Sequence, residues 1–269
     1  MEAQPETIWR SPEAIVEIGF QRSQVVMMNE AHSDLKRCIR TRQIGKRILP
    51  VAHQAGVRHL AIEALQLPLI ADRSNQSRTA PDYQSGYLAQ PEMRDFIQTA
   101  LDMGWTLISY EADLSLSSTG KEINLPKSTD SREQLLSSIK EYLDWREEQQ
   151  ALNLIAALQA LPAGTPILVW CGNGHHSKRA SPDLIPMGYQ FQQKSHINPF
   201  VIDQIRTVKF DALDDPIETE LVMQFADEWT KYGGTAGFLI EETPPSLAHY
   251  HFEDLGNDAF LFSTQNELE

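Results

Sequence analysis

Apolar runs that stop at polar, chemically active side chains constrain this chain more than any other feature. The first run, residues 25–28, is apolar without alternation and is followed by Glu30 and His32. Such a run is typical of a strand covered on both faces, because an exposed face would carry polar residues at every second position. Glu30 and His32 are two residues apart, so in an extended segment they point the same way. The stretch alone is equally compatible with the start of a solvated loop.

The same pattern recurs three times along the chain. The later runs and the polar residues that end them are 57–62 with Glu63, 105–110 with Glu111, and 166–171 with the turn Gly172-Asn173-Gly174-His175-His176. A basic helix is predicted between the first two runs, from Ser33 to Gly56, with a kink or break at Pro50. Strand, helix and strand predict a right-handed unit of two parallel strands. Ligands of open α/β sheets bind beyond the carboxyl ends of the strands, where Glu30, His32 and Glu63 are expected together.

The remaining segments complete an α/β prediction. Helices are predicted at 11–19, 91–103, 131–161 and 216–231, and further strands at 199–210, 238–240 and 259–262. The predicted fold is one domain, residues 1–269, with a central, largely parallel sheet flanked by helices. Residues 66–90 and 112–130 show little periodicity and are interpreted as loops or as a partly helical lid over the strand carboxyl ends.

The composition and the start of the sequence limit which binding partners and which cellular compartment we expect. The chain has 37 Asp and Glu against 23 Lys and Arg, a formal charge of -14, which argues against nucleic acid or an anionic membrane as the main partner. The start of the sequence lacks the basic and apolar regions of a signal peptide, and no run approaches transmembrane length. We therefore expect a cytoplasmic protein with a small-molecule substrate or ligand. Cys38 and Cys171 are too few for a disulfide framework, and Cys171 is expected to be a small core residue. The oligomeric state is left open.

Taken together, the motifs resemble the erythromycin esterase-like proteins, in a wider grouping with Tiki/TraB-like metalloprotease relatives and ChaN-like haem-binding proteins. The family's first motif, Gly-Glu-x-His or Gly-Glu-x-x-His at the end of a strand, is matched by Glu30 and His32. Its second, a glutamate ending the next strand, is matched by Glu63. Its third, an arginine-led helix before a strand ending Trp-Ala-x-Asn-x-His, is matched by Arg146, Asn153, Trp170, Asn173 and His175. The resemblance spans about residues 24 to 263.

The sequence departs from the family pattern at two positions. Asn29 stands where the family normally has glycine, and Gly172 stands where erythromycin esterase-like members often carry a further histidine. The short Glu-x-His spacing, and the Gly-x-x-His from Gly172 to His175, look more like the ChaN and Tiki side of the grouping. For that side, metal or haem binding has been proposed.

The leading functional hypothesis is a hydrolase in which an activated water attacks an ester or related carbonyl. His32 is the candidate general base, because an imidazole titrates near neutral pH, and Glu30 or Glu63 would orient it. His175 would polarise the carbonyl or protonate the leaving group, and Arg146 would neutralise developing negative charge. In a variant of this hypothesis, Glu30, His32 and His175 hold a divalent metal that activates the water.

Other interpretations of the same residues stay open. His32 and His176 also fit structural histidines, Arg146 a plain ion pair on a helix surface, and Glu111 a solvated strand end. A second functional class is a binding protein that holds haem, a metal or a small anionic ligand without turnover. A third is a non-catalytic scaffold.

Overall fold

A computed structural model describes residues 9–30, 36–63, 65, 68–83, 87–113, 132–204, 227, 229–243, 245–252 and 256–263. Its strands are β1 (Val25–Glu30), β2 (His59–Ile62), β3 (Thr106–Ser109), β4 (Ile167–Gly172), β5 (Phe200–Asp203), β6 (Thr235–Leu239) and β7 (Ala259–Ser263). Its helices are α1 (Pro12–Arg22), α2 (Lys36–Gln54), α3 (Pro68–Ser77), α4 (Pro91–Asp102), α5 (Arg132–Gln159) and α6 (Met187–Ser195). Short 3-10 helices are η1 (Tyr87–Ala89), η3 (Ile240–Glu242) and η4 (Pro245–Tyr250).

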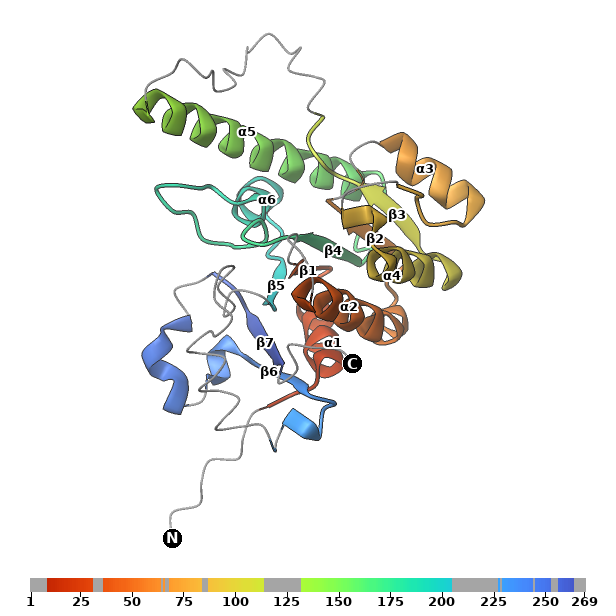
Figure 1. The fold of residues 1–269 in the computed structure, drawn as a ribbon, viewed down its shortest axis with the longest axis vertical. Helices are drawn as coiled ribbons and strands as arrows, with labels where there is room; N and C mark the ends of the chain where they lie inside the picture. The colour runs from red at the N-terminus through yellow and green to blue at the C-terminus, as the bar shows by residue number, and fades with distance from the viewer. Residues whose placement is uncertain are drawn as a thin grey trace.

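The strands form one seven-stranded sheet in the order β3-β2-β4-β1-β5-β7-β6 (Figure 1). Neighbouring strands are parallel except for β6 and β7, which pair antiparallel. The four runs singled out in the sequence are β1 to β4, and their carboxyl ends lie at one edge because those strands are parallel. The predicted α/β fold with a largely parallel sheet is confirmed.

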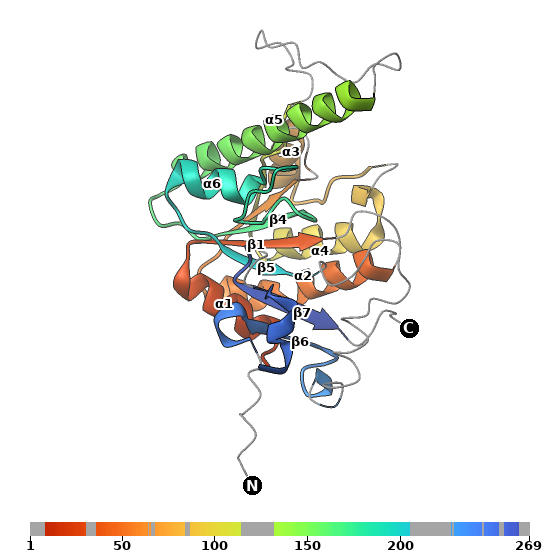
Figure 2. The same ribbon diagram turned by 90° about the vertical axis from the view of Figure 1, so that its left-hand side faces the viewer.

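Helices cover both faces of the sheet (Figure 2). Val26 and Met28 of β1 belong to a core shared with α1, α2 and α4, whereas Val25 and Met27 belong to one shared with α5 and α6. This split follows from the strand, in which successive side chains point to opposite faces. Both sets are fully buried, which explains why β1 lacks polar residues until its end.

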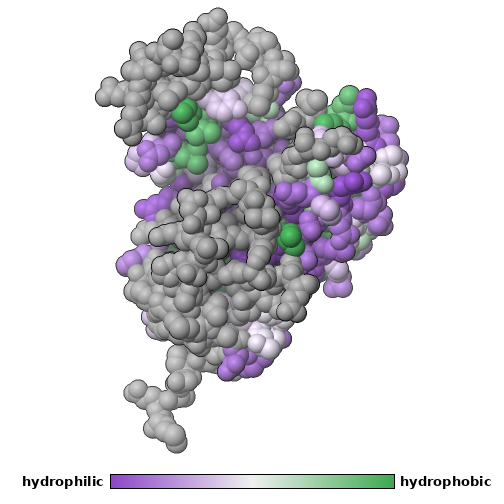
Figure 3. Space-filling view, in the orientation of Figure 1, coloured by the Kyte–Doolittle hydropathy of each residue, from purple (hydrophilic) through white to green (hydrophobic). Residues whose placement is uncertain are grey.

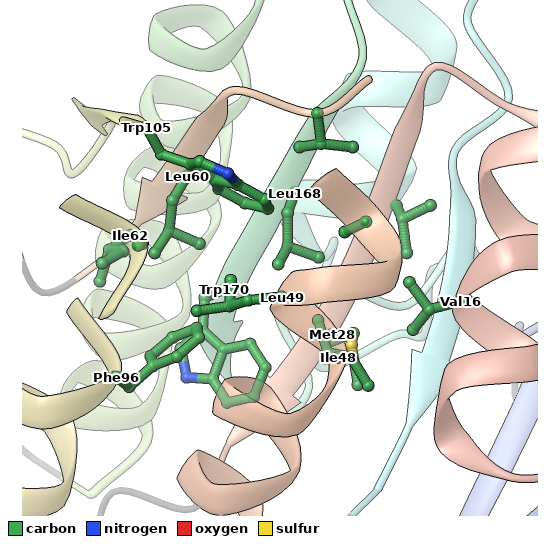
Figure 4. Packing of buried hydrophobic residues seen from close by; sticks show 14 of the residues in the cluster. Val16, Met28, Ile48, Leu49, Leu60, Ile62, Phe96, Trp105, Leu168 and Trp170 are labelled. Carbon is green, nitrogen blue, oxygen red and sulfur yellow. The ribbon is translucent and has the colours of Figure 1, made fainter. Parts of the chain in front are cut away.

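Figure 4 shows the packing on the α2 face, where Phe96 lies against Trp170 with ring centroids 4.8 Å apart. Gly45 lets α2 approach this pair, because a Cβ there would be 2.8 Å from Trp170 and 3.1 Å from Phe96. Full burial of a side chain as large as phenylalanine stabilises a fold by about 1.5–3 kcal/mol. The aromatic pair thus anchors α2 and α4 beside the end of β4.

The starts of α1 and α4, at Pro12 and Pro91, follow their sequence signals. Ser11 caps α1 by accepting a hydrogen bond from the Ala14 amide at 3.2 Å, as its position before Pro12 predicts. Of the predicted kink or break at Pro50, the break is wrong, because α2 continues through Pro50. A proline inside a helix costs about 3 kcal/mol, and burial of Ile48, Leu49 and Ala52 offsets that cost. The predicted cap at Ser33 lies outside the described residues.

The interpretation of residues 66–90 as a loop is wrong for 68–77, which form α3. The helix docks on the edge strand β3 through Asn75, whose side chain accepts from the Leu107 amide at 2.7 Å and donates to its carbonyl at 2.9 Å. These two hydrogen bonds pair the backbone amide and carbonyl of Leu107 on the open edge of β3. Because α3 docks through a polar side chain, it has no long apolar stripe, and its sequence shows little helical periodicity. Residues 114–131 and most of 216–231 lie outside the described residues. The one-domain organisation and the lid role stay predictions.

The described surface in Figure 3 is mostly hydrophilic. Large apolar side chains that remain exposed include Leu69 on α3 and Ile139 and Leu152 on α5. None of the helices within the described ranges combines the length and apolar character needed to cross a membrane.

Candidate functional site

Five side chains meet at the carboxyl ends of β2, β3 and β4, on the face of the sheet that α5 covers. We call them the carboxylate–cation cluster: Glu63, Glu111, Arg146, Glu147 and His175. Three of them, Glu63, Arg146 and His175, were predicted as site residues from the sequence. The edge of the sheet where they meet is the one where ligands bind in this class of fold.

Arg146 of α5 joins the ends of β2 and β3. Its Nη2 donates to Glu63 Oε1 at 2.5 Å and also to Glu111 Oε2, while its Nε donates to Glu111 Oε1 at 3.0 Å. Asn153, two turns along the same helix face, donates to the backbone carbonyls of Tyr110 and Glu111. Only 19% of the Arg146 side chain is exposed, so this is not a plain ion pair on a helix surface.

Glu111 is a buried member of the cluster, and its interpretation as a solvated strand end is wrong. Besides Arg146, its Oε1 accepts from Gln150 Nε2 at 3.0 Å and from the Ala112 amide at 2.7 Å. The sequence places a third carboxylate at a strand end but does not show that α5 crosses over it. That long-range contact removes the side chain from water.

Glu63 holds the two cations of the cluster together. Its Oε2 accepts from the Gly172 amide at 2.5 Å, which ties β2 to the turn after β4. Its Oε1 accepts from Arg146 and lies 3.5 Å from His175 Nε2. A single buried oxygen therefore faces both a guanidinium and an imidazole ring.

His175 lies between two carboxylates. Its Nδ1 is hydrogen-bonded to Glu147 Oε1, and its Nε2 faces Glu63. Burial lowers the pKa of the ring, but Glu63 and Glu147 outweigh burial and raise it to about 9. The ring is therefore an imidazolium at neutral pH, and it carries a proton that it can donate.

The turn that carries His175 is held by the start of α6. The Gly188 amide donates to the His175 carbonyl at 2.8 Å, and the Met187 amide donates to Glu147 Oε2 at 2.6 Å. A Cβ on Gly188 would lie 2.1 Å from the His176 carbonyl oxygen, so only glycine permits this approach. The position of the imidazole thus depends on the packing of α6 against the turn.

Glu30 lies at the same edge but on the opposite, α2 face of the sheet. It is buried and accepts from Arg42 Nε at 3.0 Å. Burial raises the pKa of Glu30 to about 7, with Arg42 opposing the shift and the charge of Glu63 adding to it. The carboxyl groups of Glu30 and Glu63 are thus electrostatically coupled although they face different helices. His32 lies outside the described residues.

Asn29 and His176 belong to a second polar cluster, at the end of β5. The Asn29 amide donates to Asp203 Oδ1 at 2.9 Å, and its Oδ1 accepts from the Gln204 amide at 2.8 Å. His176 is buried, with Nε2 4.0 Å from Asp203 Oδ2. It therefore faces away from the carboxylate–cation cluster, as expected of a residue adjacent to His175. The Asn29 side chain links the ends of β1 and β5.

The predicted metal set is Glu30, His32 and His175. Within the described part of the chain, no three His, Cys, Asp or Glu side chains are grouped so that they could hold a metal ion. Two members of the set also have different partners, Glu30 with Arg42 and His175 with Glu63 and Glu147. The described residues do not fit a metal, and no step below is routed through one.

Sequence reasoning missed Glu147 and Arg42. Both are charged residues within helices that look solvated in the sequence, and both are fully buried. Glu147 follows Arg146 directly, which is the only local signal of its role. Arg42 has a weaker signal, since it lies on a basic helix that must pack against a strand ending in a carboxylate.

The high pKa of His175 predicts a loss of stability in alkali. The folded protein holds this proton more tightly than the unfolded chain, so the stabilisation is complete below pH 6.5 and is lost as the pH rises through about 9. The shift corresponds to roughly 3 kcal/mol of unfolding free energy. Urea denaturation at pH 6.5, 8 and 9.5 should show this decline in the natural protein and a flatter profile in His175→Gln. Parallel profiles would contradict the assignment.

Comparison with known proteins supports the fold alone. No family model and no curated protein matches the sequence. The α/β fold is shared with a solved erythromycin esterase structure. That structure is a mutant of the erythromycin esterase EreC in its open conformation, and it matches with a TM-score of 0.55, 10% identity and coverage of 97% of this chain and 99% of that one.

Two other solved structures have similar coverage. A Bacillus cereus protein matches with a TM-score of 0.53 and 10% identity, covering 92% of this chain and 90% of that one. ChaN of Campylobacter jejuni, a structure that describes cofacial haem binding, matches with a TM-score of 0.49 and 13% identity, covering 94% and 91%. The chain also matches parts of bacterial protein toxins and spans 36% of the length of one of them.

Proposed function

We propose that this protein is a cytoplasmic hydrolase that cleaves an ester or a related carbonyl bond of a small molecule with an activated water. The observation that carries the proposal is the shared oxygen of Glu63, which brings the Arg146 guanidinium and the His175 imidazolium to one point. Two cations at the carboxyl edge of a parallel sheet suit the negative charge that develops on a carbonyl oxygen.

The exposed fractions of the cluster's side chains support a substrate that approaches the two cations. The carboxylates of Glu63 and Glu111 are 4% and 7% exposed, whereas the side chains of Arg146 and His175 are 19% and 14% exposed. The hydrogen bonds of Arg146 to Glu63 and Glu111 use its Nε and Nη2. A substrate therefore meets donors first, with the carboxylates behind them.

Each residue has a role in the proposed reaction. His32, the candidate base, takes a proton from the attacking water. Arg146 stabilises the oxyanion of the tetrahedral intermediate. His175 then donates its Nε2 proton to the leaving alkoxide as the carbon–oxygen bond breaks, and the proton on the base returns to solvent or to His175. Glu63 keeps the two cations in place.

The test is hydrolysis of a panel of aryl esters, aliphatic esters and lactones by the purified protein. We expect turnover that EDTA does not change, because the described residues do not fit a metal. The double variant His32→Ala, His175→Ala supplies the background rate. Turnover equal to that background for every substrate would contradict the proposal. Haem added to the protein should leave the Soret band unchanged, and a saturable shift would favour the binding-protein alternative instead.

A further inference from the structure

Glu147 differs from its neighbours on α5 in what it contacts. It is fully buried, and both of its carboxylate oxygens are used, Oε1 by His175 Nδ1 and Oε2 by the Met187 amide. The next residue, Glu148, instead forms a surface ion pair with Lys194 at 2.8 Å. A buried carboxylate with two fixed partners cannot rotate freely, so it sets the direction of the ring that it binds.

We propose that Glu147 is the positioning residue of the site: it retains the proton on His175 Nδ1, so that Nε2 alone delivers a proton to the leaving group. This inference rests on the proposed hydrolase function, and it identifies Glu147 as the group that orients the proton donor, His175.

The geometry explains why a second carboxylate is needed. Glu63 lies 3.5 Å from Nε2, too far for a good hydrogen bond, so it attracts the charge without capturing the proton. Glu147 is hydrogen-bonded to the opposite nitrogen and prevents the ring from flipping. After Nε2 has given its proton to the alkoxide, the neutral ring keeps Nδ1–H on Glu147, and Nε2 is the only nitrogen that can be reprotonated.

The first test uses Glu147→Gln with Glu148→Gln as the matched control. A glutamine keeps the size of the side chain but loses its charge, so the pKa of His175 should fall from about 9 towards its ordinary value. The ester hydrolysis rate of Glu147→Gln should then be reduced at least tenfold at pH 8.5 and much less at pH 6. Glu148→Gln should keep the natural profile. A merely structural role predicts equal losses at both pH values, and that result would overturn the proposal.

The second test does not depend on activity. With ¹⁵N-labelled histidine, the ring nitrogens of His175 report both the pKa and the tautomer. Above the pKa, the natural protein should show the Nδ1–H tautomer, and a titration unchanged by Glu147→Gln would overturn the proposal. If the natural protein hydrolyses no ester but the ring titration shifts as expected, the hydrolase assignment fails while the role of Glu147 in holding the ring stands. Should the variant not fold, an Nε2–H tautomer in the natural protein would still overturn it.

Discussion

Replacing His175 with alanine should lower kcat/KM for ester hydrolysis by roughly 10²–10⁴-fold, the usual contribution of a positioned acid or base. The loss should appear mainly in kcat, because the imidazolium acts on a leaving group that is only charged as the bond breaks. It should also be smallest for esters of acidic phenols, whose leaving groups need no proton. Steady-state kinetics with aryl esters of graded leaving-group pKa measure both effects.

The control for this variant is His196→Asn, an exposed histidine at the end of α6. Its φ of 59° lies in the left-handed region, which asparagine adopts readily, so the substitution should leave both fold and rate unchanged. If His175→Ala kept the natural rate, or lost it equally for all leaving groups, His175 would not be the acid.

Replacing Glu30 with glutamine should destabilise the protein by about 3–5 kcal/mol at pH 8, where the natural carboxylate is ionised. The change removes the carboxylate that the fully buried Arg42 binds, and a guanidinium cannot neutralise itself by losing a proton. Arg42→Met should cost less, because the remaining Glu30 carboxyl already has a pKa of about 7 and can take up a proton. Urea denaturation of both variants measures this asymmetry.

The matched control is the exposed pair of Arg22 and Glu241, whose side chains are 44% and 61% exposed. Glu241→Gln should change the unfolding free energy by no more than about 1 kcal/mol. Equal losses of unfolding free energy for Glu30→Gln and Arg42→Met would show that lost packing, not the loss of the carboxylate partner of Arg42, causes the destabilisation.

Much of the fold could be predicted from the strands alone. Runs such as residues 25–28 and 166–171 carry no alternation, and both are strands covered by helices on each face. Parallel pairing then requires their ends to share an edge, which is why Glu63 and His175 meet although they are 112 residues apart. The strand ends therefore contain the information that locates this part of the site.

The partners of the site residues depend on which face of the sheet each helix covers, and the sequence does not show this. Glu30 and Glu63 both end buried strands, but Glu30 points towards α2 and Glu63 towards α5, so they have different arginine partners. The helix periodicity of a single sequence does not reveal that Arg42 and Glu147 are buried. Both are buried where a helix meets the end of a strand, a tertiary effect that local pattern does not contain.

One helix, α5, carries the Arg146 guanidinium, the Glu147 carboxylate that is bonded to His175, and the Asn153 amide that contacts the segment after β3. Arg146, Glu147 and Asn153 occupy about two turns of α5, and each rises only about 1.5 Å per residue along its axis. The chain consequently cannot shift its guanidinium without also shifting the anchor of its proton donor. A bend or tilt of this helix would therefore move the partners of Glu63 and of His175 at the same time.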